Sequence, residues 1–205
     1  MGCLKSLIHK IIFLVVLVAF FAFGGYAFVQ NAIKSYQNPT RSEFVKSEKN
    51  YGNFSNVSGD YQLSRNFNLF GYKKISAKYL PTGQKITIYD LKNEKTLSTK
   101  DFQTREIDKK IDNILNSAKD SIITLEDFKI VQRGSYLAKN KTVPFVRFNA
   151  KVKNIPFKNV SGVIACYSTI NEKAKEPSTK LIVTMTDLKA YNPTIVQGFV
   201  SAIRF

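Results

Sequence analysis

The sequence predicts an α+β domain, a mostly antiparallel β-sheet flanked by helices, preceded by one N-terminal transmembrane helix. Three observations lead to this prediction. An uncharged apolar run lies near the start of the chain, several later segments alternate apolar and polar residues, and two segments repeat apolar residues every three to four positions. The chain has 205 residues, of which 44% are hydrophobic and 22% charged, which suits one domain and argues against disorder.

The first element is the apolar run over residues 11–29, which follows a short basic tail over residues 1–10. Its 19 residues carry no charge, and about 20 apolar residues in a helix cross a hydrocarbon core of roughly 30 Å. The alternative is a signal peptide cleaved near Ala27, because small residues stand at the −3 and −1 positions of that cut. Both interpretations export the remainder of the chain. We expect a single-pass membrane protein with an extracytoplasmic C-terminal domain, or a secreted domain if cleavage occurs.

Residues 30–65 are expected to form a flexible tether. This segment is rich in Asn, Ser, Gly and charged residues and sustains neither a period of 2 nor one of 3.6. The patterned domain is therefore predicted to span residues 66–205.

The domain is expected to open with two strands and a helix. Residues 67–80 and 84–91 alternate as strands do around the turn-forming Pro81-Thr82-Gly83. The helix is predicted over residues 102–119, where Ile107 and the apolar residues after it draw a single stripe.

Four further strands and a final helix follow. Residues 126–136 and 143–153 alternate and are separated by a short polar connection, which predicts a hairpin. Residues 160–170 are apolar or small on both faces, as in a central strand covered on both sides. A last strand ends at Asp187, and a helix with Pro193 at its first position closes the domain.

The order ββ-α-ββββ-α, ending in the strand LIVTMTD and a short amphipathic helix before Phe205, resembles the PsbP family and its Mog-type Ran-binding relatives. The resemblance covers about residues 65–205 and lacks the Trp that such members often carry. It implies a twisted antiparallel sheet between helices and a non-enzymatic accessory or assembly role on a larger complex. It supplies no catalytic residues. The membrane-anchored domains of nuclear-transport-factor type suit the anchor better, but they usually place their helices before the sheet.

Catalytic chemistry is limited by the residue types present. His9 is the single histidine and precedes the apolar run, so the domain holds no Ser-His-Asp or Cys-His arrangement and no His-containing zinc site. Cys166 lies mid-strand and is expected to be a buried core residue. Asp108 and Asp112 share a helix face that we interpret as solvated. We therefore predict no enzyme activity, no metal and no cofactor.

Positive charge is the one feature that suggests binding. Residues 35–205 carry 28 basic and 15 acidic side chains, a net charge of +13. Two cationic groups are predicted to form a candidate anion- or partner-binding face, one on the expected hairpin and one near the first strands. Their members are Lys129, Arg133, Arg147, Lys151, Lys153, Lys73, Lys74 and Lys78. Lysine far outnumbers arginine, with 25 against 6, and a lysine-rich solvated surface set by base composition remains an alternative.

Three functional hypotheses follow from the sequence. The first is a non-catalytic membrane-anchored envelope protein whose domain docks on a partner complex as an accessory or assembly module. The second is a cationic binding module for anionic lipid or cell-wall polymer. The third is a histidine-free hydrolase that uses Asp, Lys or Ser. Nucleic acid is disfavoured as a partner, because the chain has no aromatic–basic module signature.

Overall fold

The computed structural model describes most of the chain after residue 25, in seven stretches. These are residues 26–66, 73–91, 99–104, 106–117, 125–152, 159–170 and 177–205. The chain divides into two compact units, Met1–Asn38 and Pro39–Phe205. The second unit holds the sheet and all the sites described below.

The expected transmembrane helix lies mostly outside the described residues. Residues 1–25 are not described, and Tyr26–Val29 begin the helix α2 (Tyr26–Gln37). Of the helices that the structure describes, none is both long and apolar enough to cross a membrane.

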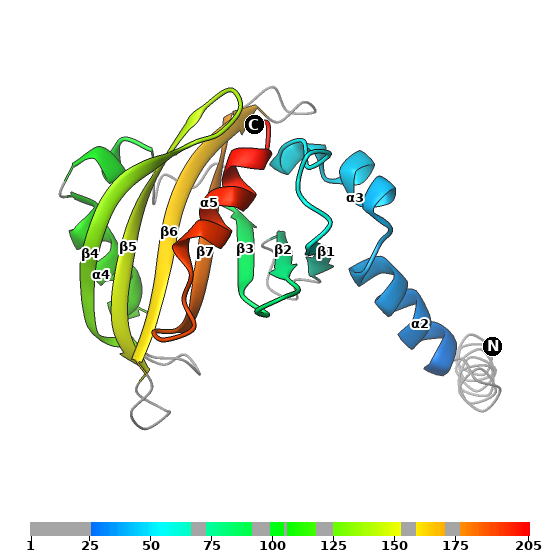
Figure 1. Ribbon diagram of the computed structural model, residues 1–205, viewed down its shortest axis with the longest axis horizontal. Coiled ribbons are helices and arrows are strands. Elements are labelled where there is room, and N and C mark those ends of the chain that lie inside the picture. The colour runs from blue at the N-terminus through cyan, green and yellow to red at the C-terminus, as the bar shows by residue number, and fades with distance from the viewer. Residues whose placement is uncertain are drawn as a thin grey trace, which may run out of the picture. The chain divides into compact units, whose positions relative to one another are not determined.

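Seven strands form one sheet (Figure 1). They are β1 (Tyr61–Asn66), β2 (Lys74–Tyr79), β3 (Lys85–Asp90), β4 (Leu125–Leu137), β5 (Thr142–Val152), β6 (Asn159–Ile170) and β7 (Pro177–Asp187). Their order is β1-β2-β3-β7-β6-β5-β4, and every neighbouring pair is antiparallel. The expected hairpin is confirmed as β4 and β5, and β3 joins the sheet by pairing with β7 rather than with its successor in sequence.

The remaining described elements of this unit are short helices. They are α3 (Arg41–Ser47), the 3-10 helix η2 (Lys49–Tyr51), the 3-10 helix η3 (Asp101–Gln103), α4 (Glu106–Ser117) and α5 (Pro193–Ala202). Asn192 caps α5 by accepting a hydrogen bond from the Thr194 amide, and Pro193 starts it, as the sequence predicts.

The predicted fold class is wrong in its balance of helix and strand. The described part of the chain is predominantly β, a seven-stranded antiparallel sheet with few helices, and not a PsbP-like α+β domain. The helices are too short to form continuous layers, since α4 has 12 residues and α5 has 10. The sequence pattern also missed β1, which pairs with β2 along its full length.

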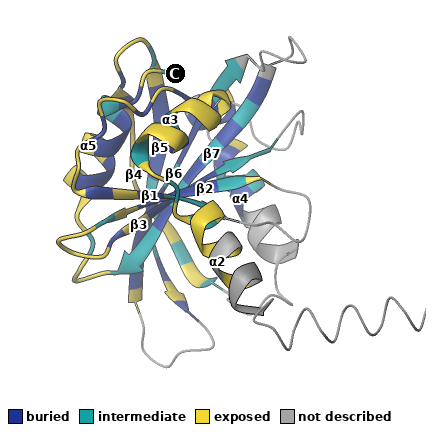
Figure 2. Ribbon diagram, turned by 90° about the vertical axis from the view of Figure 1, so that its right-hand side faces the viewer, coloured by how far each residue is buried: buried dark blue, intermediate teal, exposed yellow. Residues whose placement is uncertain are grey.

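The two faces of the sheet are covered unequally. On one face, α5, α3 and the segment between α3 and β1 enclose the largest apolar cluster, which includes Phe44, Phe54, Tyr167 and Phe199. On the other face, α4 and η3 cover a smaller cluster that includes Cys166. Figure 2 shows buried residues along the strands and exposed ones along much of α3. We call these the α5 face and the α4 face.

The segment for which the sequence predicted a tether, residues 30–65, contributes to this core. It contains α3, η2 and β1, and Phe44 and Phe54 in it are fully buried with their rings edge to face, 5.4 Å apart. The segment is irregular and polar on average, so no sustained period marks its few aromatic anchors.

Candidate functional site

The structure divides the predicted cationic hairpin face between the two sides of the sheet. Cross-strand partners point to the same face, and β4–β5 register pairs Lys129 with Asn149 and Gln132 with Arg147. Lys129, Arg147 and Lys151 therefore lie on the α5 face. Arg133 is paired with Val146 and lies on the α4 face. Lys153 falls outside the described residues.

Strand β4 has two bulges, and the second of them separates Arg133 from Lys129. The β4–β5 register shifts between Glu126 and Lys129 and again between Ile130 and Gln132, and each shift adds one residue to β4. Asp127, at the first bulge, has a φ of 52°. Because side chains alternate with a period of two, one added residue moves every later side chain to the opposite face. Plain alternation from Lys129 to Arg133 thus fails at the second bulge.

Two of these cations are engaged in ion pairs. Arg133 Nη2 donates to both oxygens of Asp108 on α4, at 2.5 and 2.6 Å. Lys151 Nζ lies 2.7 Å from Asp127 Oδ2, and this hydrogen bond lowers the pKa of Asp127 and raises the pKa of Lys151. The Asp108 carboxylate, which the sequence placed on a solvated helix face, is therefore held by β4.

Arg147 is partly buried. It lies near Tyr136 and Tyr191 on the α5 face; burial raises the pKa of Tyr191 to about 12, and the Arg147 guanidinium opposes that rise. Within the described part of the chain, Arg147 Nε and Asn149 Oδ1 are buried without a hydrogen-bond partner. Arg147 is thus turned into the domain rather than displayed on a binding surface.

The second predicted cluster lies far along the sheet from the hairpin. Lys74 is paired with Tyr89, and its Nζ lies 5.8 Å from the centre of that ring. Lys73 and Lys78 are exposed. Strands β3, β7 and β6 separate β2 from the hairpin, so the eight predicted residues do not form one face.

A groove runs along the edge strand β4. Two of the predicted cations, Lys129 and Arg133, line it. Its volume is about 640 Å³, and its walls are Asp108 and the consecutive residues 128–133. Among the described strands, β4 pairs with β5 alone. Because six consecutive residues line the groove, side chains of both faces and the strand's free edge border it. We call it the β4 groove.

The β4 groove combines apolar and charged walls. Phe128 stacks on Phe148 with their ring centres 4.9 Å apart, and the Val131 side chain at the bulge is 44% exposed. Lys129 is exposed, whereas Arg133 is tied to Asp108. An unpaired strand edge offers backbone N–H and C=O groups to an added strand, and flanking apolar side chains give such a strand contacts. This arrangement suits an extended peptide segment.

The Cys166 thiol is buried in the smaller cluster on the α4 face. Burial raises the pKa of the Cys166 thiol to about 12, so it is protonated at neutral pH. Ser178 and Lys180 are also buried, and both contact Asp90, at 2.8 and 2.7 Å. No group of three or more His, Cys, Asp or Glu side chains that could hold a metal occurs within the described stretches.

No known protein-family model matches this chain, and it has no significant match among curated proteins. The function must therefore be inferred from the geometry. Sequence patterning found Lys129 and Arg133 but missed the groove they border, because the bulges that expose Val131 break the alternation. The available signal was Val131, an apolar residue that breaks the alternation of the strand at the second bulge.

Proposed function

We propose that this protein is a non-catalytic accessory or assembly module of the cell envelope, which docks on a partner complex by receiving an extended segment of a partner protein in the β4 groove. The observation that carries the proposal is the groove itself, a hollow of about 640 Å³ along residues 128–133 of an edge strand. The uncharged run over residues 11–29 supports the envelope location, because its two interpretations both export the domain.

The charge of the domain indicates the kind of segment that would fit. Residues 35–205 carry a net charge of +13, and Lys129 is an exposed cation of the groove, whereas the other cation, Arg133, is paired with Asp108. A partner strand with apolar residues facing Phe128 and Val131 and acidic residues near Lys129 would match both walls. Electrostatic attraction of this kind mainly raises the association rate and weakens with salt.

Site-specific crosslinking tests the proposal with a matched pair of positions. Val131 and Leu188 are both 44% exposed, but only Val131 lines the groove. A photoreactive residue is placed at either position of the full chain, and intact cells are irradiated. We expect Val131 to give a discrete crosslinked partner that Leu188 does not give. Equal recovery at the two positions, or no protein adduct at Val131, would contradict docking in the groove.

A second variant tests whether the groove's apolar wall is required. Val131→Asp places a carboxylate in the groove, where it would repel an acidic segment and remove an apolar contact. With the photoreactive residue at Gln132, we expect this substitution to abolish the adduct, whereas Leu188→Asp should leave it. An adduct that survives Val131→Asp unchanged would argue against strand addition at this edge.

A further inference from the structure

A second hollow, of about 540 Å³, lies where four segments distant in sequence meet. The segments are the α3–η2 region with the residues after it, the tip of the β4–β5 hairpin, the end of β6 and the residues after α5. Their polar contributors are Lys49, Asn53, Lys141, Ser168, Thr169 and Arg204. None of these residues belongs to the predicted cationic groups or to the β4 groove. We call this site the Lys49–Lys141–Arg204 hollow.

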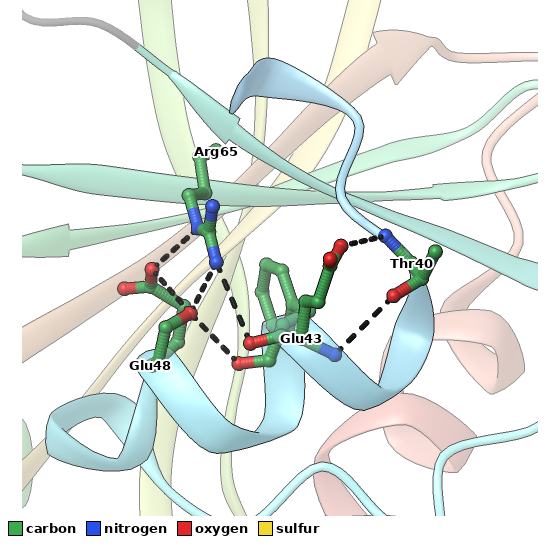
Figure 3. A network of polar contacts seen from close by, with 6 residues as sticks. Thr40, Glu43, Glu48 and Arg65 are labelled. Atoms are coloured by element: carbon green, nitrogen blue, oxygen red, sulfur yellow. Dashed lines mark hydrogen bonds and ion pairs between the residues drawn. The ribbon is translucent and has the colours of Figure 1, made fainter. Parts of the chain in front are cut away.

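One wall of the hollow is fixed by a polar network at α3 (Figure 3). Thr40 and Glu43 form a capping box in which the Thr40 amide donates to Glu43 Oε2 at 2.9 Å. Arg65 of β1 donates from Nε to Glu48 Oε1 at 2.8 Å and from Nη2 to the Ser47 hydroxyl. The Arg65 and Glu48 side chains are 15% and 17% exposed, so this pair is well shielded. The network attaches α3 to the sheet and thereby positions Lys49, which follows directly.

The other walls are joined by backbone contacts. The Asn53 amide donates to the Arg204 carbonyl at 2.8 Å, and the Arg204 amide donates back at 3.2 Å. Gly52 permits this approach: it has a φ of 130°, and a Cβ there would lie 2.8 Å from the Ile203 side chain. The Thr169 hydroxyl donates to the Asn50 carbonyl at 3.1 Å. The hollow is therefore walled by ordered backbone on several sides.

Basic side chains give this hollow an excess of positive charge. No carboxylate side chain is among its walls, and none of Lys49, Lys141 and Arg204 forms an ion pair with another described residue. Lys141 Nζ donates to the Ser168 carbonyl, which holds one ammonium at the wall. Arg133 and Lys151 differ, because each has an aspartate partner. The three cations outnumber the carboxylate of Phe205, the last residue of the sequence, which also lines the hollow and accepts a hydrogen bond from Asn140 Nδ2. This excess of positive charge favours an anion there.

We propose that the Lys49–Lys141–Arg204 hollow binds a phosphate group, either free or carried by a lipid headgroup or polymer. The Arg204 guanidinium can donate two parallel hydrogen bonds to phosphate oxygens, and the two lysines supply point charges to the remaining ones. Asn53 Oδ1 accepts from the Ser55 amide at 2.9 Å, which leaves its side-chain nitrogen as a further donor. A volume of about 540 Å³ accommodates a phosphate with a small substituent such as glycerol.

Binding of inorganic phosphate to the full-length protein provides the test. Lys49→Gln and Arg204→Gln each remove one cation whose side chain contributes no ion pair to the described fold, and Lys78→Gln removes an exposed cation elsewhere. We expect saturable binding, weakened about tenfold by either of the first two substitutions and less than twofold by Lys78→Gln. Unfolding temperatures check that all variants are folded. The proposal would be overturned if neither phosphate nor anionic vesicles bound saturably. It would also be overturned if Lys78→Gln weakened phosphate binding as much as Lys49→Gln or Arg204→Gln.

A vesicle assay identifies the source of the phosphate. Cosedimentation with phosphatidylglycerol vesicles that Arg204→Gln reduces and inorganic phosphate inhibits would assign the hollow to a lipid headgroup. Phosphate binding with no cosedimentation would assign it to a soluble or polymer-borne phosphate. The hollow and the β4 groove share no residue, so crosslinking at Val131 should persist in the Arg204→Gln variant. This control distinguishes a failure of the phosphate site from a failure of the β4 groove.

Discussion

Two lysine–aspartate pairs in this protein have the same length and opposite surroundings. Lys180 Nζ lies 2.7 Å from Asp90 Oδ1 between β7 and β3, and Lys151 Nζ lies 2.7 Å from Asp127 Oδ2 at the β4 edge. The Lys180 and Asp90 side chains are 2% and 17% exposed, whereas those of Lys151 and Asp127 are 58% and 61% exposed. The comparison separates the effect of distance from the effect of burial.

The pKa directions of the two lysines differ for that reason. Burial lowers the pKa of Lys180, although the hydrogen bond and charge of Asp90 oppose the change. At the edge, the hydrogen bond with Asp127 raises the pKa of Lys151. Lys180 is further held by the Ser178 hydroxyl at 3.0 Å and lies 5.0 Å from the centre of the Tyr51 ring. The stability of the sheet centre therefore depends on the Lys180–Asp90 pair. If one of the two charges is removed, little water reaches the other to solvate it.

The largest effect is expected from breaking the central pair. Lys180→Met leaves the Asp90 carboxylate, whose side chain is only 17% exposed, without its cation. Breaking a buried pair in this way costs about 3–5 kcal/mol of the free energy of unfolding. Denaturant unfolding followed by circular dichroism measures it.

The matched control removes both charges. Lys180→Met combined with Asp90→Leu should recover most of the loss, because no uncompensated charge remains. If the single substitution cost less than about 1 kcal/mol, the buried pair would be no more important than a surface pair.

Glycine substitutions in the same two regions are expected to change the free energy of unfolding less, and by different amounts. A Cβ on Gly162 of β6 would lie 2.2 Å from the Thr184 carbonyl oxygen, which belongs to the backbone of β7. A Cβ on Gly134 of β4 would meet only the Phe145 ring, at 2.9 Å. We expect Gly162→Ala to destabilise by about 3 kcal/mol, the upper end of the overpacking range.

Gly134→Ala should change the free energy of unfolding much less, because the Phe145 ring can shift. The substitution also restricts the unfolded chain, which offsets about 0.4–1 kcal/mol. Parallel denaturant titrations of the two variants compare them directly. Equal losses would mean that the β4 edge is packed as rigidly as the sheet centre.

Sequence reasoning was successful where burial imposes a regular pattern. Strand β6 was predicted as covered on both faces, and Ala165 and Cys166, on opposite faces, are both fully buried. Alternation likewise predicted the β4–β5 hairpin, and Pro193 marked the start of α5. In these segments the side-chain period is the direct consequence of which face is buried.

The remainder depends on contacts that no local pattern records. The helices are too few and too short to form continuous layers on the sheet. The apolar stripe of a single helix does not reveal this, and the fold class was therefore predicted wrongly. Strand β1 has only six residues and carries Arg65, whose partner Glu48 lies in an irregular segment. The Lys49–Lys141–Arg204 hollow unites Lys49 and Arg204, which are 155 positions apart in the chain. Only long-range pairing brings such residues together.

The smallest change in the free energy of unfolding is expected at the exposed Lys151–Asp127 pair. Lys151→Met removes the same ammonium from the same 2.7 Å contact, but water solvates Asp127 in its place. The midpoint of denaturant unfolding should stay within experimental scatter of the parent protein, and added salt should not change the difference, since little attraction is left to screen. The hydrogen bond of this pair raises the pKa of Lys151 and lowers the pKa of Asp127, although both side chains are exposed. A loss comparable to that of Lys180→Met would show that the distance, and not the burial, sets the contribution of an ion pair here.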